Sequence, residues 1–169
     1  MAASPIALVR SAALAPIVRF LDQEGVPYEP IFEAAKLSPR LIERPSDLFP
    51  LVQGFALAEQ MAHVLALDDV GLLAASHVEI SDFGQLGDMV CGAATLSEAL
   101  HSLIRGVTAF STGERLSLAW RGQRLFFCHR FAIRAVPGQR HADSYSLVVM
   151  IKAAQQDGRL EARRFGWRL

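Results

Sequence analysis

The hydrophobic pattern of the chain is clearest between residues 83 and 135, where a helical period gives way to a twofold one. Between Thr95 and Phe110, apolar side chains recur every three or four residues, which predicts an amphipathic helix. Thr95 and Glu98 have the spacing of a capping box, in which each side chain accepts a hydrogen bond from the other residue's backbone N–H. We therefore expect this helix to begin immediately after Thr95.

A β-hairpin is predicted directly after that helix. Apolar residues alternate with others from Arg115 to Trp120, with Leu116, Leu118 and Trp120 on one face, and again from Leu125 to Ile133. Gly122-Gln123 separates the two segments, and two-residue loops are the commonest connections in hairpins. We expect two antiparallel strands, each with one buried face.

The segments outside the hairpin are mostly helical in pattern. Helices are predicted after Pro16, from Glu29 to Ala35, after Pro50, after Asp68 or Asp69, and from Arg140 to Gln156, with a short turn from Ser38-Pro39. The last helix is apolar all round at its centre, which places it between two layers. Residues 4–10 alternate too briefly to distinguish a short strand from an arm.

A third strand is predicted at the end of the chain, where Phe165, Trp167 and Leu169 alternate with other residues. Together these elements indicate an α+β fold. We expect a helical layer of about six helices packed beside a small antiparallel sheet of three or more strands.

Three short motifs carry a family resemblance. They are Gly84-Gln85-Leu86-Gly87, Thr95-Leu96-Ser97-Glu98-Ala99-Leu100 and Ser111-Thr112-Gly113. With them the chain resembles the N-terminal effector domain of AraC-type transcription regulators, and more narrowly the subgroup called arabinose-binding-like. The similarity extends from about Ala13 to the end of the sequence and includes Arg163-Arg164-Phe165, where the family has a short strand.

The resemblance implies a ligand-sensing regulatory domain. Residues 1–169 would form a single effector-sensing domain, and the DNA-binding helix-turn-helix domain of the family is absent from this sequence. A small-molecule effector would bind in a largely apolar cavity and alter contacts with a DNA-binding half or with a second copy of the chain. None of the motifs is catalytic, so we expect no enzyme and no cofactor. The alternative is a dimerisation or interaction module without a small-molecule ligand.

Composition agrees with a domain that does not itself bind DNA. The chain has 17 acidic and 17 basic residues, whereas nucleic-acid-binding domains usually carry a basic excess. Two unclustered cysteines without secretory features indicate the reducing cytoplasm. No segment approaches the roughly 18 apolar residues of a membrane-spanning helix, so we expect no membrane partner.

His129 is the strongest candidate for a ligand contact. It falls on the same strand face as Phe127 and Phe131, and a polar ring there needs a hydrogen-bond partner. It could contact a ligand in a pocket between sheet and helices, or be a structural histidine satisfied by a backbone carbonyl or by Tyr145. Tyr145 and Ser144 could likewise direct hydroxyls into that space or simply pack in the core. The predicted lining is Phe127, His129, Phe131 and Tyr145.

Other chemistry has little support in the sequence. The five histidines are scattered and the cysteines are unpaired in spacing, so no metal site is predicted. Ser144 does not lie in the GxSxG turn of a serine hydrolase. Four arginines near the end of the chain could form a domain-contact surface or the polar face of an edge strand. These are Arg159, Arg163, Arg164 and Arg168.

Overall fold

The computed structural model describes residues 6–133 and 136–156. Within them are seven α-helices, three short 3₁₀ helices and four strands. The α-helices are α1 (Ala15–Gln23), α2 (Tyr28–Ala34), α3 (Leu51–Leu65), α4 (Val70–Ser76), α5 (Gln85–Cys91), α6 (Leu96–Phe110) and α7 (Gln139–Gln155). The 3₁₀ helices are η1 (Ser11–Leu14), η2 (Pro39–Glu43) and η3 (Ile80–Phe83). The strands are β1 (Leu8–Arg10), β2 (Leu48–Pro50), β3 (Glu114–Arg121) and β4 (Arg124–Phe131).

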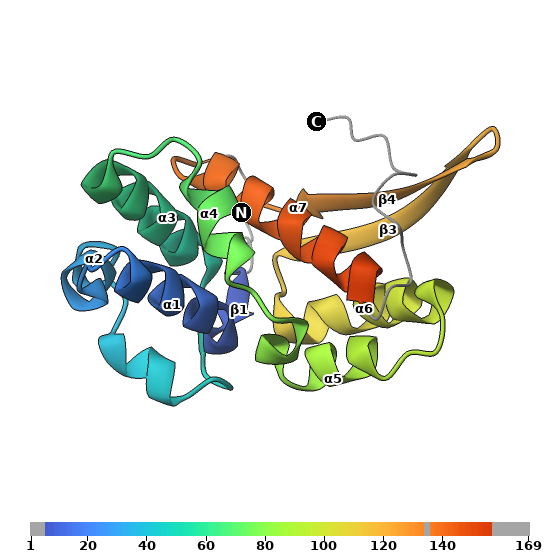
Figure 1. Ribbon diagram of the computed structural model, residues 1–169, viewed down its shortest axis with the longest axis horizontal. Coiled ribbons are helices and arrows are strands. Elements are labelled where there is room, and N and C mark those ends of the chain that lie inside the picture. The colour runs from blue at the N-terminus through green and yellow to red at the C-terminus, as the bar shows by residue number, and fades with distance from the viewer. Residues whose placement is uncertain (1–5, 134–135, 157–169) are drawn as a thin grey trace, which may run out of the picture.

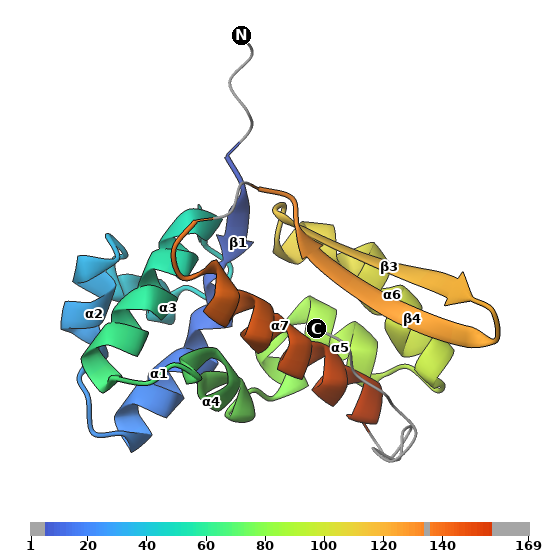
Figure 2. The same ribbon diagram turned by 90° about the horizontal axis from the view of Figure 1, so that it is seen from above.

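The elements form two groups, and α7 lies across both (Figures 1 and 2). The first group contains α1–α4 with β1 and β2, and the second contains η3, α5, α6 and the hairpin β3–β4. Helix α7 contacts α3 and α4 in the first group and η3, α6 and β4 in the second. It therefore bridges the two groups. It is not enclosed between two layers as predicted, because most of its residues are partly exposed.

The hydrophobic core runs through both groups. Phe20 and Phe55 are almost completely buried in the first group, and Val90 and Leu103 are buried in the second. All four belong to one continuous cluster of packed side chains. The two groups therefore share one core.

Strand β1 connects the two groups. It pairs antiparallel with β2, and Val9 also forms an isolated antiparallel bridge with Ser111, just before β3. The Thr112 N–H donates to the Leu8 carbonyl over 2.8 Å. The undecided segment at residues 4–10 therefore contains a short strand at Leu8–Arg10.

The predicted sheet of three or more strands is wrong for the described residues, which contain two separate two-stranded antiparallel sheets. The physical reason lies at Ser111, where β1 reaches the second group through a single bridge. That bridge stops short of Glu114, where β3 begins, so no continuous ladder joins the pairs. The strand expected at Phe165–Leu169 lies outside the described residues.

The predictions that rest on neighbouring residues, the start of α6 and the hairpin loop, agree better with the structure than the predicted sheet does. The Glu98 N–H donates to the Thr95 hydroxyl over 3.2 Å, and α6 begins at Leu96 as predicted. The capping box differs in one bond, because the Glu98 carboxylate accepts from the Ala94 N–H rather than from that of Thr95. In the hairpin Arg121 pairs with Arg124, which confirms the two-residue loop.

The hairpin extends beyond the body of the molecule (Figure 1). Trp120 is 71% exposed although it alternates in register with the half-buried Leu116 and Leu118. It pairs with Leu125 beside the loop, where neither side chain is covered by a helix. The predicted buried face therefore ends before Trp120.

Two glycines set how closely α7 approaches the first group. A Cβ atom on Gly71 in α4 would lie 2.0 Å from the carbonyl oxygen of His141 in α7. A Cβ on Gly138, the residue before α7, would lie 1.9 Å from the carbonyl oxygen of Phe55 in α3. Only glycine allows these backbones to touch, so α7 is seated directly against α3 and α4.

We predict that Gly71→Ala lowers the free energy of unfolding by roughly 1–3 kcal/mol, because the added methyl group must push α4 and α7 apart. Chemical denaturation measures this change. Gly54→Ala is the matched control, since a Cβ there lies an ordinary 3.4 Å from the Phe49 ring. Alanine is favoured in a helix interior by about 0.8–1 kcal/mol, so the control should be neutral or stabilising. Equal losses in the two variants would contradict the close approach.

Candidate functional site

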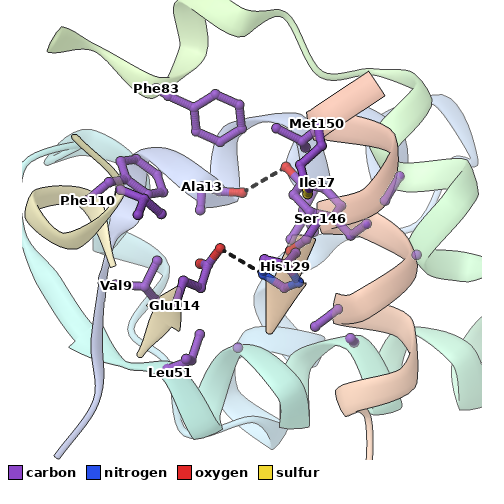
Figure 3. Close-up of a pocket in the computed structure, with 18 of the residues that line it drawn as sticks. Val9, Ala13, Ile17, Leu51, Phe83, Phe110, Glu114, His129, Ser146 and Met150 are labelled. Carbon is purple, nitrogen blue, oxygen red and sulfur yellow. Dashed lines mark hydrogen bonds and ion pairs between the residues drawn. The ribbon is translucent and has the colours of Figure 1, made fainter. Parts of the chain in front are cut away.

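A cavity of about 150 Å³ lies between the two groups and α7 (Figure 3). Its wall is contributed by β1, α1, α3, α4, α5, α6, the hairpin and α7, and most of the lining side chains are apolar. An apolar cavity of comparable volume in another protein binds benzene. The space is therefore large enough for a small organic molecule. The polar lining side chains are Glu114, His129, His141, Tyr145 and Ser146.

Three of the four predicted lining residues meet at this cavity. His129, Phe131 and Tyr145 contribute to its wall, and Phe131 packs edge-on against both Phe55 and His129. Phe127 is not part of the wall: it lies nearer the hairpin loop and packs partly buried against the core. The contact of these residues with a ligand stays a prediction.

His129 pairs with Glu114 across the hairpin. Its Nε2 atom lies 3.2 Å from the Glu114 Oε2 atom, and the two side chains are only 10% and 16% exposed. The Nε2 atom is therefore bonded neither to a backbone carbonyl nor to Tyr145, the two partners expected from the sequence. The partner is a carboxylate at the start of the neighbouring strand.

Glu114 was missed by the sequence analysis, although the hairpin contains the signal. Leu116 lies directly opposite His129 in the register, and Glu114 shares the strand face of Leu116. Long side chains two positions from a direct partner lie within reach across a sheet. The predicted two-residue loop fixes the pairing of the two strands, and that pairing places Glu114 near His129.

The Glu114 carboxylate retains capacity for further hydrogen bonds. A carboxylate offers about four acceptor sites, and among the described residues only His129 donates to it. Figure 3 shows Glu114 and His129 facing one another inside the cavity, near Val9 and Leu51. A hydrogen-bond donor inside the cavity could therefore bind to this carboxylate.

Tyr145 also has unused hydrogen-bonding capacity. Its hydroxyl donates to the Ala13 carbonyl over 3.5 Å, which is long for an O–H···O bond (Figure 3). Burial, and then the nearby charge of Asp82, raises the pKa of Tyr145 above its ordinary value of 10.0. The phenol therefore stays protonated and able to donate. Ser144 bonds the Arg140 carbonyl of its own helix and does not line the cavity.

His141 is a second buried histidine in the wall. Its side chain is 2% exposed, and its Nε2 atom has no hydrogen bond within the described residues. Burial lowers the pKa of His141 below 6.5, and Arg140 lowers it further, while Glu59 and Asp68 act in the opposite direction. The ring is thus neutral near pH 7. The sequence analysis assigned no role to His141, because no local pattern of residues indicates that its side chain is buried.

The arrangement suits binding better than catalysis. Its wall is mostly apolar, with a few polar groups that could fix a ligand's orientation, as is usual for small-molecule sites. Across residues 6–133 and 136–156, no three histidine, cysteine, aspartate or glutamate side chains gather so as to hold a metal ion. None of the helices in those ranges is both long and apolar enough to cross a bilayer.

We predict that stability falls with pH below about 6.5, in part through His141. The unfolded chain binds a proton at this histidine more readily than the folded protein, so unfolding becomes easier as pH falls. The loss of unfolding free energy between about pH 7.5 and pH 5.5 should be smaller in His141→Gln than in the unmodified chain. Denaturant titrations at both pH values measure it.

His63→Gln is the control for this experiment, because His63 is exposed on α3. It should keep the pH dependence of the unmodified chain. If His141→Gln also kept that dependence in full, the neutral buried state assigned to His141 would be wrong.

Comparison with known families gives one match. A family model described as the N-terminal arabinose-binding domain of AraC transcription regulators matches residues 25–161. These residues are most of the chain and include α2 to α7. Comparison with individual curated proteins finds no match.

Proposed function

Because the chain belongs to the family of N-terminal arabinose-binding domains of AraC transcription regulators, we propose that it senses a small-molecule effector in the cavity. The family is a regulatory, ligand-binding one and not a family of enzymes. We further propose that residues 1–169 form one sensing domain that acts in the cytoplasm. Its signal passes to a DNA-binding half of the regulator or to a second copy of the chain.

The cavity is the observation that carries this proposal. Its wall draws on both groups of elements and on α7, so a ligand inside it would touch all three at once. When the cavity of about 150 Å³ is empty, the lining side chains lack van der Waals contacts on the side that faces it. A ligand of matching shape restores those contacts and thereby stabilises the closed arrangement, in which the two groups and α7 surround the cavity.

Signalling requires that the ligand favour one arrangement of the two groups. A ligand that binds two arrangements equally shifts nothing, whereas one that fits the closed arrangement better shifts the population toward it. Polar contacts that join the groups would change with such a shift. The Arg10 guanidinium donates to the Ala109 carbonyl over 3.0 Å, and Arg19 pairs with Asp82.

Arabinose itself fits this cavity poorly. A pentose carries polar groups on every carbon, whereas few of the side chains that line the wall are polar. Each buried hydroxyl left without a partner costs about 1–3 kcal/mol. We therefore propose that the effector of this chain is less polar than a sugar.

The second candidate is an interaction module that dimerises without a ligand. The exposed Trp120 and Leu125, paired beside the hairpin loop, favour it because large apolar side chains in water often mark contact surfaces. That function predicts a filled core, however, and the cavity speaks against it. Dimerisation through the hairpin is also compatible with ligand sensing.

We predict that a matching small molecule raises the melting temperature of the chain. A ligand present at a hundred times its Kd adds about 2.7 kcal/mol to the free energy of unfolding. Amino acids, fatty acids, sugars and aromatic alcohols form the test panel, and differential scanning calorimetry measures the shift. If no class of compound raised the melting temperature, small-molecule sensing would lose its support.

Ala58→Leu tests whether the cavity is the binding site. Ala58 lines it on the same face of α3 as Phe55 and Met61, so a larger side chain there occupies ligand space. We expect the variant to fold and to lose most of the ligand-induced shift. Ala34→Leu, at an exposed position of α2, should respond to the ligand like the unmodified chain. An undiminished shift in Ala58→Leu would place the ligand elsewhere.

A further inference from the structure

We infer that the cavity selects a small, mostly apolar alcohol, whose hydroxyl binds Glu114, and that it rejects carboxylates. The inference rests on the proposed function, because it concerns the chemistry of the same cavity. It assigns one pole of the ligand to the Glu114–His129 pair and the rest of the ligand to the apolar wall.

The apolar wall favours a ligand that is mostly hydrocarbon. Val9, Leu51, Phe83, Phe110 and Met150 surround the space in Figure 3. Contact with such side chains favours a ring or a short branched hydrocarbon, whose surface leaves water on binding. At about 150 Å³ the space suits a single aromatic ring with a small substituent.

The charged side chain in the wall determines which polar group the ligand can carry at its other end. Glu114 is the one carboxylate, and neither lysine nor arginine occurs, among the described residues of the wall. The carboxylate accepts from His129 and has acceptor sites to spare, so it can take a hydrogen bond from a ligand O–H. A ligand carboxylate would instead meet a like charge in a poorly solvated space.

Tyr145 favours the binding of an alcohol over that of an amine. Its protonated phenol needs an acceptor better than the Ala13 carbonyl, which lies 3.5 Å away. A hydroxyl group can both donate, as Glu114 requires, and accept, as Tyr145 requires, whereas an ammonium group can only donate. An ammonium would also have to lose its hydration on entering the apolar space. A neutral hydroxyl therefore suits the polar groups of the wall better than an ammonium group does.

A matched series of toluene, benzyl alcohol, benzylamine and benzoate tests the inference by isothermal titration calorimetry at pH 7. The four share one ring and differ in the polar group. We expect benzyl alcohol to bind tightest, about tenfold tighter than benzoate. Tightest binding by benzylamine or by benzoate would overturn the inference, and so would equal binding of toluene and benzyl alcohol.

Glu114→Gln gives a signature that a purely structural role would not produce. Loss of the charge should weaken benzyl alcohol about tenfold, strengthen benzoate, and leave toluene unchanged within about twofold. Glu33→Gln, at an exposed position of α2, should leave all four affinities unchanged. A uniform change in all four ligands with Glu114→Gln would contradict the assigned contact.

Tyr145→Phe provides a second variant in case Glu114→Gln does not fold. It should weaken benzyl alcohol and leave toluene unchanged, and equal effects on the two would overturn the role of the phenol. Failure of the inference is separable from failure of the proposed function. If toluene and benzyl alcohol bind equally and Ala58→Leu abolishes both, the cavity still senses ligands but without the hydroxyl pole. If none of the four binds, the inference is wrong, and the broader panel alone decides the proposed function.

Discussion

The close seating of α7 on α3 and α4 determines how the two groups are held together and where the cavity lies. Gly71 and Gly138 let two pairs of backbones come closer than any side chain would permit, and this fixes one end of α7 in the first group. The same helix must then cover α6 and β4 in the second group. Side chains of α7 reach across the space between the groups without filling it, and the cavity lies there. The architecture of the domain and its candidate site thus have a common origin.

The polar groups of the cavity follow from the hairpin. Its register brings Glu114 near His129, and each side chain satisfies part of the other's need for a hydrogen bond in a largely buried position. The two interpretations of His129, structural residue and ligand contact, therefore do not exclude one another. A histidine held by a carboxylate is positioned for binding, and the carboxylate keeps acceptor sites for a ligand.

Features with local causes were predictable from the sequence, and features that depend on distant contacts were not. The Thr95 cap and the two-residue hairpin loop depend on neighbouring residues, and both were predicted. The pairing of β1 with β2 joins segments far apart in the chain, and no pattern of residues in the sequence predicted it. In the site, alternation identified the face of His129 but could not show that Phe127 lies outside the cavity. The burial of His141 likewise depends on how α7 packs.

Methyl-resolved NMR can show, residue by residue, whether a small molecule binds in the cavity between the two groups. With leucine and valine methyl groups labelled, benzyl alcohol should shift the signals of Leu51, Val107 and Val149, which line the cavity. The signals of Val52 and Leu72, which are exposed, should stay in place. Shifts confined to the exposed methyl groups, or no shifts with any ligand that stabilises the chain, would show that the cavity is not the binding site.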